Sequence, residues 1–450
     1  MNDLTGRLKE LTKQFDVPGV AVAILTEDGV ETATAGVLNR NTKVAVTPDS
    51  IFQIGSITKV YTTTLLMQLV DDGLVDLDKP VVTYLPKFNL KDPGAEKIKV
   101  RHLVTHTNGI EGDYFKDFGR GEDAVEKYVK SLRKIGLAHP TGKFWSYSNA
   151  AFVVAGRIIE VLTGMTWDDA MRNKIYKPAG LNEHATLAAD AILFRASAGH
   201  IHKPGQKKAV VGRPWSLPRS TGPAGATQLA SARDVVAFGA IHMNDGQAAN
   251  GAQIISPASA KLMQTPQYKL TGSETGQMGL GWLIEEWNHK KVISHNGGTI
   301  GQLSFLWVVP ELRAAVCILT NSDTGPMLAD PLSREIFKDR FKLDRPALPE
   351  VPKKPVQLDL KKYAGRYERL NVSLEVEVLD DKLKVTMDAA SLTGEDEHEP
   401  QVFPVTPLDK ERFAIVNGEG KVAGVLNFQS FDRAGRPEYI FVGRLAKRVK

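Results

Sequence analysis

Cysteine is almost absent from this sequence, in which Cys317 is the single copy among 450 residues. One cysteine cannot form an intrachain disulfide, so a small scaffold held together by disulfides is excluded. Cys317 lies within the apolar run 314–319, which is typical of a buried strand. We therefore interpret it as a small core residue rather than as a reactive thiol.

The sequence also lacks long apolar runs and blocks of like charge. No stretch reaches the ~18 consecutive apolar residues of a membrane helix, and residues 1–8 lack the apolar core of a signal peptide. As given, the sequence predicts a cytoplasmic protein without a membrane span, although export is compatible with it. The net charge is only +5, and no basic block alternates with aromatic residues. Nucleic acid is therefore not an expected partner.

The chain is long enough for two domains, because a single core stops growing at roughly 250–300 residues. Residues 345–355 contain four prolines and almost no large apolar side chain. Such a composition predicts a stiff linker. We expect one domain over 1–344, the proline-rich linker over 345–355 and a second domain over 356–450.

The two predicted domains differ in their secondary-structure patterns. In the first, strand patterns at 20–25 and 31–37 and again at 291–294, 304–309 and 314–319 enclose a mainly helical stretch. This order predicts an α/β (α+β) fold, with one antiparallel sheet built from both ends of the domain and flanked by helices. In the second domain, short alternating runs such as 374–378 and 383–387 predict an all-β barrel.

Ser56 and Lys59 form the most informative pair, at the start of a predicted buried helix over 60–70. Residues three apart share a helix face, so the Lys59 amine would lie beside the Ser56 hydroxyl. A serine hydroxyl becomes a useful nucleophile when a base takes its proton. Lysine can be that base once burial or a nearby positive charge lowers its pKa. Free backbone N–H groups at the helix start would stabilise an oxyanion.

Ser-x-x-Lys by itself is a weak signal, because Ser131 and Lys134 repeat it in a charged helix. Ser56 is distinguished by two other motifs in the chain. Tyr147-Ser148-Asn149 is the single Tyr-x-Asn, and His295-Asn296-Gly297 is the single His-x-Gly, followed by Gly298.

These three motifs resemble, in order and spacing, the active-site motifs of the serine β-lactamase and penicillin-binding-protein superfamily. That group includes class C β-lactamases, DD-peptidases, D-aminopeptidases and related esterases. Further similar segments are 103–109, 279–282 and Asn321, so the resemblance spans roughly residues 5–340.

The resemblance implies a role for each matching position. Ser56 would be the nucleophile, Lys59 and Tyr147 would share the proton transfers, and Asn149 would bind the substrate amide and Lys59. The backbone N–H groups of Ser56 and Gly298 would form the oxyanion hole, with Gly297 beside them. A strand-borne glycine pair also suits close approach of a substrate backbone.

One position departs from the β-lactamases proper, which carry lysine where this chain has His295. Histidine is mostly neutral at neutral pH, so the site should attract a substrate carboxylate less strongly. Its ordinary pKa also predicts an inflection in the activity–pH profile. Among the relatives, His295 resembles DD-peptidases, D-aminopeptidases and esterases, which favours peptide, amide or ester substrates over β-lactams.

Other candidate residues are open to simpler interpretations. His200 and His202 form half of a metal site at best, and a polar loop is the preferred interpretation. Trp145 and Trp282 flank motifs and are equally compatible with pocket walls and with core packing. The segment 363–367, Tyr-Ala-Gly-Arg-Tyr, resembles the opening of lipocalin-like barrels that follow some peptidases of this superfamily.

Together these observations predict a serine acyl-hydrolase of two domains that acts through a Ser56 acyl-enzyme and needs no cofactor or metal. The preferred activity is that of a peptidase or amidase on a small molecule or short peptide. A carboxylesterase, a transacylase, a weak β-lactamase and a catalytically silent penicillin-binding or sensor protein remain alternatives. A homo-oligomer is possible. Because all three motifs precede residue 300, we expect the barrel to govern access rather than chemistry.

Overall fold

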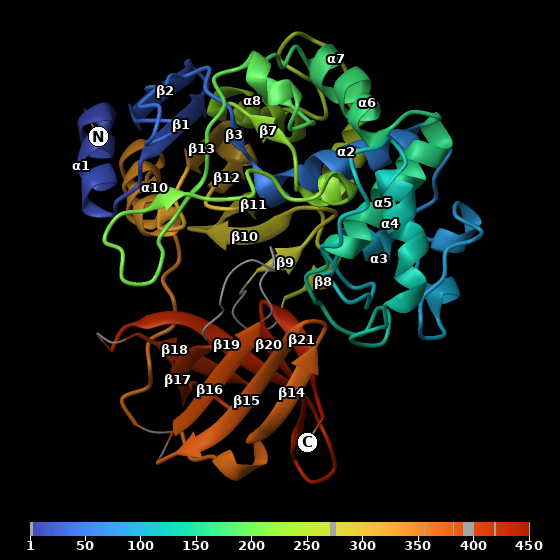
Figure 1. Ribbon diagram of the computed structural model, residues 1–450, viewed down its shortest axis with the longest axis vertical. Coiled ribbons are helices and arrows are strands. Elements are labelled where there is room, and N and C mark those ends of the chain that lie inside the picture. Colours follow the sequence, from blue (N-terminus) through green and yellow to red (C-terminus); the bar gives the residue numbers. More distant parts are fainter. Residues whose placement is uncertain are drawn as a thin grey trace.

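The computed structural model describes residues 3–270, 276–354, 356–380, 382–389, 400–417 and 420–449. Within these ranges a large part with a central sheet is followed by a barrel, which lies below the sheet in Figure 1. The predicted α/β domain with a C-terminal all-β barrel is confirmed.

The central sheet is antiparallel and has the strand order β2-β1-β13-β12-β11-β10-β9-β8. Both ends of the first part contribute to it, as the strand patterns predicted. Its strands are β1 (Gly19–Thr26), β2 (Gly29–Gly36), β8 (Tyr268–Lys269), β9 (Gln277–Met278), β10 (Leu283–Trp287), β11 (Lys290–Gly298), β12 (Leu303–Val309) and β13 (Ala314–Thr320). Shorter strands outside this sheet are β3 (Phe52–Gln53), β4 (His184–Ala185), β5 (His200–Ile201), β6 (Val210–Val211) and β7 (Leu229–Ala230).

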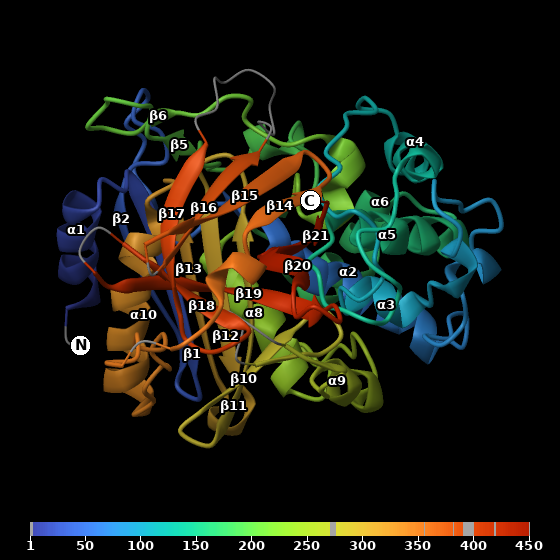
Figure 2. The ribbon, with the colours of Figure 1, turned by 90° about the horizontal axis from the view of Figure 1, so that it is seen from below.

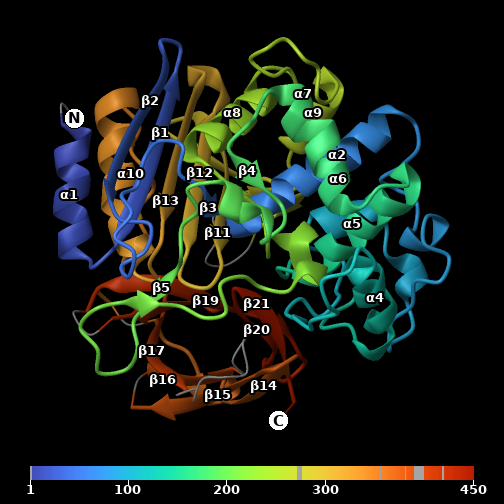
Figure 3. The ribbon, with the colours of Figure 1, turned by 45° about the horizontal axis from the view of Figure 1, so that its top comes forward.

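The middle strands are apolar on both faces because helices cover both sides of the sheet. Every residue of β13 is buried, including Cys317, so the interpretation of this cysteine as a core residue is confirmed. On one face, Leu8 and Leu11 of α1 (Leu4–Gln14) share a core with Leu332 and Phe337 of α10 (Gly325–Phe341). Figure 3 shows these two helices together at one side of the sheet.

Helices also cover the other face and extend into a helical region beside it (Figure 1). They are α2 (Thr58–Asp71), α3 (Val100–Val104), α4 (Ala124–Ser131), α5 (Asn149–Thr163), α6 (Trp167–Met171), α7 (Lys177–Ala179), α8 (Ala232–Met243) and α9 (Pro257–Met263). In the described ranges, no single helix is long and apolar enough to cross a membrane, and only a bent pair, Asn149–Thr163 with Trp167–Ala179, meets that test when joined.

The C-terminal part is a closed barrel of eight antiparallel strands. They are β14 (Gly365–Arg369), β15 (Val372–Leu379), β16 (Lys382–Ala389), β17 (Gln401–Pro407), β18 (Arg412–Val416), β19 (Val422–Phe431), β20 (Pro437–Val442) and β21 (Arg444–Arg448). Buried residues such as Phe413, Phe428 and Ile440 fill its interior, as expected for a small barrel. This architecture is consistent with the predicted lipocalin-like domain.

The barrel is docked against the first part. Tyr439, Phe441 and Leu445 point outward from it and share an apolar cluster with Phe144 and Trp145. Seen from below, the barrel lies in front of the sheet and helices (Figure 2). The described residues of 345–355 form neither helix nor strand. We keep the boundaries 1–344, 345–355 and 356–450 as a proposal.

Candidate active site

Ser56 lies on a tight turn immediately before the buried helix. The turn, Gly55–Ile57, is a short 3-10 helix that leads into α2 (Thr58–Asp71). Gly55 adopts φ +50°, which favours glycine. The sequence predicted Ser56 at a helix start, and the structure places it in the 3-10 turn that leads directly into α2, where it lines a cavity.

Lys59 is fully buried and lies beside Ser56, as the spacing predicted. Its Nζ is 3.0 Å from Ser56 Oγ, 2.7 Å from Asn149 Oδ1 and 2.6 Å from the carbonyl oxygen of Ala224. A neutral amine has two hydrogens and one lone pair. When the hydrogens are donated to Asn149 and Ala224, the lone pair faces Ser56, which is the arrangement that a general base requires.

The pKa of Lys59 is held well below its ordinary value, chiefly because burial disfavours the charged ammonium. The guanidinium of Arg444 lowers this pKa further, and Asp113 opposes the shift. Burial is thus the main cause of the shift, and the nearby positive charge that adds to it is that of Arg444 on the barrel.

Tyr147 and Asn149 approach Lys59 from the start of α5, where Ser148 caps the helix. The ring of Tyr147 stacks on His106 with 4.2 Å between ring centres, and Lys59 Nζ lies 4.8 Å from the Tyr147 ring centre. Burial raises the pKa of Tyr147 well above its usual range, although a hydrogen bond with the Ser56 side chain opposes the shift. Tyr147 is therefore protonated at neutral pH, which favours Lys59 as the base.

His295 is buried on β11 and lines the cavity beside Ser56. Its Nδ1–H donates to the carbonyl oxygen of Asn296 at 2.6 Å. Burial and the proximity of Lys59 lower the pKa of His295 to about 3. We therefore expect a neutral imidazole throughout the neutral range, which argues against the predicted inflection near its ordinary pKa.

Gly297 and Gly298, the two glycines that follow His295 and Asn296, have different structural roles. A Cβ on Gly297 would lie 1.9 Å from the Ile54 carbonyl oxygen and 2.8 Å from Ser56 N, so only glycine allows β11 to approach the Ser56 turn. Gly298 instead is exposed and lines the cavities. A Cβ on Gly55 would lie 2.5 Å from Gly298 N. The backbone nitrogens assigned to the oxyanion hole thus belong to two segments in close contact.

Two cavities meet at Ser56. One, of about 360 Å³, has a largely apolar wall that includes Trp145. The other, of about 680 Å³, is more polar and includes Asp113 and Asn149. Of the two tryptophans considered from the sequence, Trp145 is thus a pocket residue. Trp282 is fully buried in the main core and is a packing residue.

Sequence reasoning missed three residues near this site. Asp113 lies 2.9 Å from Arg369 and 2.6 Å from Arg444, both on the barrel, and its other oxygen accepts from Asn149 Nδ2 at 3.2 Å. Arg444 also lies over the Tyr147 ring, 5.1 Å from its centre. The barrel therefore reaches the predicted catalytic groups, and the expectation that it governs access rather than chemistry stays a prediction.

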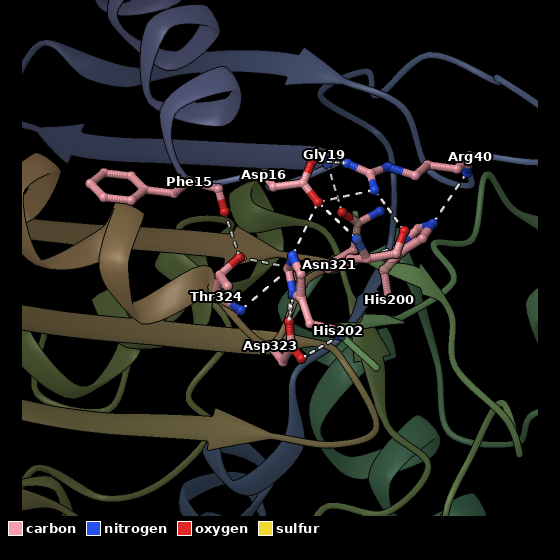
Figure 4. A network of polar contacts seen from close by, with 11 residues as sticks. Phe15, Asp16, Gly19, Arg40, His200, His202, Asn321, Asp323 and Thr324 are labelled. Atoms are coloured by element: carbon pink, nitrogen blue, oxygen red, sulfur yellow. Dashed lines mark hydrogen bonds and ion pairs between the residues drawn. The ribbon is translucent and has the colours of Figure 1, made fainter. Parts of the chain in front are cut away.

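His200 and His202, considered above as half of a metal site or as part of a polar loop, both take part in hydrogen bonds that link separate segments of the chain. His202 lies between two carboxylates, with Nδ1 2.6 Å from Asp323 Oδ1 and Nε2 3.1 Å from Asp16 Oδ2, and Arg40 also pairs with Asp16 (Figure 4). His200 lies on the short strand β5 rather than in a loop, and is buried. Among the described residues, no group of three or more His, Cys, Asp or Glu side chains is placed to hold a metal. The network joins the chain before β1 to the β5–β6 hairpin.

The activity–pH profile is expected to have one acidic limb, set by Lys59. The base must be deprotonated to act, so a pKa lowered below 10.5 extends activity to lower pH. No second inflection is expected near pH 6.5, because His295 stays neutral down to a pKa of about 3. Measuring kcat/KM between pH 4 and 10 checks this. An inflection near pH 6.5 that His295→Gln removes would contradict it.

Comparisons with known proteins show the family and the fold of the chain. The β-lactamase family model matches residues 4–339. Penicillin-binding protein 4 of Amycolatopsis lactamdurans is 37% identical over 372 residues, which is 81% of this chain and 96% of that protein. The crystal structure of SurE covers 100% of this chain and 99% of its own, with a TM-score of 0.81 and 23% identity, and it has also been solved with D-Leu. D-amino acid amidase from Ochrobactrum anthropi, complexed with L-phenylalanine amide, covers 75% of this chain and 99% of its own, with a TM-score of 0.63 and 22% identity.

The fold and the sequence relationships define an enzyme of the serine hydrolase class. More specifically, the chain belongs to the β-lactamase family, which includes the penicillin-binding proteins.

Proposed function

We propose that the chain is a peptidase or amidase that acts through a Ser56 acyl-enzyme, with D-configured residues as its preferred substrates. The observation that carries the proposal is the placement of Lys59 Nζ, 3.0 Å from Ser56 Oγ and held by Asn149 and Ala224 in buried surroundings that lower its pKa. Relatives named penicillin-binding protein and D-aminopeptidase support the substrate class.

The reaction begins when Lys59 takes the Ser56 proton as Oγ attacks the substrate carbonyl carbon. The Ser56 and Gly298 N–H groups stabilise the resulting oxyanion. The C–N bond then breaks, and the proton passes by way of Lys59 or Tyr147 to the leaving amine. In the second half, water attacks the acyl carbon and gives a proton to Lys59. The acyl C–Oγ bond then breaks, and Lys59 returns that proton to Ser56 Oγ as the carboxylic acid leaves.

Neutral His295 favours amides and peptides over β-lactams, because it provides no cation for a β-lactam carboxylate. An ester has the same carbonyl geometry and a better leaving group, so carboxylesterase activity is the second candidate. An acyl-enzyme can also meet an amine instead of water, which would give acyl transfer. The oligomeric state of the chain stays a prediction.

Mass spectrometry combined with a substrate panel tests the proposal. At Ser56, a fluorophosphonate should add one phosphonyl group with loss of HF, and a penicillin should add its whole mass because its ring opens. In a panel of D-amino-acid amides, their L-counterparts, p-nitrophenyl esters and nitrocefin, we expect the D-amides to be hydrolysed and nitrocefin to react poorly. The absence of any adduct would instead indicate a silent binding protein, and nitrocefin as the best substrate would reverse the substrate assignment.

A further inference from the structure

The smaller of the two cavities at Ser56 has a wall shared between the sheet, the loop before α5 and the barrel. Its volume of about 360 Å³ lies in the range of small-ligand sites. The apolar wall is formed by Trp145, Met278, Leu283, Leu303, Phe305 and Phe441.

Among the described residues that line this cavity, the one cation is paired with a carboxylate. His295, which also lines it, is neutral because its pKa is lowered to about 3. That cation is the guanidinium of Arg444, and Asp113 Oδ2 lies 2.6 Å from its Nε. Transfer of an apolar group into such a space is favourable, whereas an anionic group would have to compete with Asp113 for Arg444.

Phe441 is the barrel's apolar contribution to this wall. Side chains alternate across β20, so Ile440 packs inside the barrel while Phe441 faces the first part of the chain. The Phe441 ring lies 5.6 Å from Trp145, centre to centre, and only 1% of the residue is exposed. The bond from Leu445 N to Ser146 Oγ, 3.1 Å long and buried, fixes the next strand in the same place. The ring is therefore held rigidly.

We infer that this cavity is a subsite for an apolar side chain next to the attacked carbonyl, and that Phe441 sets the size of the side chain it accepts. The inference rests on the proposed function, because it assumes that the carbonyl is attacked by Ser56. The barrel would then help to determine which substrates the enzyme prefers, in addition to limiting access to the site.

Two substitutions in the full-length chain test the inference in opposite directions. Phe441→Ala enlarges the cavity and Phe441→Trp fills it. For wild type, kcat/KM should favour the amides of D-leucine or D-phenylalanine over D-alanine amide by about tenfold or more, from the extra apolar surface buried. Phe441→Ala should move the preference toward D-tryptophan amide, and Phe441→Trp should move it toward D-alanine amide, each by about tenfold.

Tyr439→Ala is the matched control. Tyr439 lies on the same strand, faces the same way and packs on Phe144 with 5.0 Å between ring centres, but it is not part of the cavity wall. Its loss disturbs docking without reshaping the cavity, so the wild-type order of substrates should persist. If Tyr439→Ala shifts the order as Phe441→Ala does, loosened docking explains the effect and the inference fails.

Failure of the inference can be separated from failure of the proposed function. If Ser56 is labelled by fluorophosphonate in every variant and the order of substrates stays unchanged, or D-glutamate amide is preferred, the apolar subsite is wrong. If no amide is hydrolysed, the subsite can still be tested by measuring the binding of amides to Ser56→Ala protein by calorimetry, which needs no turnover. There D-phenylalanine amide should bind about tenfold more tightly than D-alanine amide, and additional Phe441→Trp should remove the difference. Equal affinities would overturn the subsite.

Discussion

Replacing Ser56 by alanine is expected to abolish turnover and covalent labelling while leaving the fold intact. The change removes one oxygen atom, and Lys59 keeps its bonds to Asn149 and Ala224. Loss of a nucleophile typically lowers kcat by several orders of magnitude. Steady-state kinetics, mass spectrometry after fluorophosphonate treatment and a thermal melt would measure all three quantities.

Ser131→Ala is the control, because Ser131 begins the other Ser-x-x-Lys of the chain. Its hydroxyl donates to the carbonyl oxygen of Tyr128 at the end of α4, in a helix outside the two cavities. We expect unchanged activity. A Ser56→Ala enzyme within about tenfold of wild type would assign the nucleophile elsewhere.

Lys59→Gln should produce the second-largest loss. Glutamine retains N–H donors for Asn149 and Ala224 but has no lone pair that takes a proton at neutral pH. General-base catalysis typically contributes a factor of 10²–10⁴, so kcat/KM should fall by about that amount. The residual activity should no longer show the acidic limb of the pH profile. A purely structural change would lower the rate but keep that limb.

The exposed Lys130 provides the comparison, since it pairs with Glu126 on α4. Lys130→Gln should leave both the rate and the acidic limb as in wild type. If Lys59→Gln retained the wild-type limb, the base would be another group, and Tyr147 would be the first to examine.

Much of the fold could be predicted because its strands and helices repeat a local pattern. The apolar run around Cys317 and the helix after Ser56 are buried on all sides, so their composition alone distinguishes them. The strand pairings of the barrel could not be predicted in this way. The pairing that closes the barrel joins β14 to β21, at opposite ends of the domain, and each strand by itself indicates only alternation.

The candidate site likewise contains residues that the sequence could predict and residues that it could not. Ser56, Lys59, Tyr147, Asn149 and His295 belong to motifs, and the structure brings all five together at the junction of the two cavities. Asp113, Phe441 and Arg444 have no motif, and the two barrel residues lie far beyond the last motif in the chain. Their place beside Tyr147 results from docking, which no local pattern encodes.

Asp113 has a consequence for how such a protein can be rebuilt or can diverge. One carboxylate binds two barrel arginines and also orients Asn149, so its charge serves the docking interface and the predicted catalytic centre at once. Exchanging the barrel for one that lacks Arg369 and Arg444 would leave the Asp113 carboxylate near Lys59 without these two cations, favouring the protonated amine. A chimera would therefore inherit a weakened base along with its new barrel. The three positions are expected to be inherited as a set.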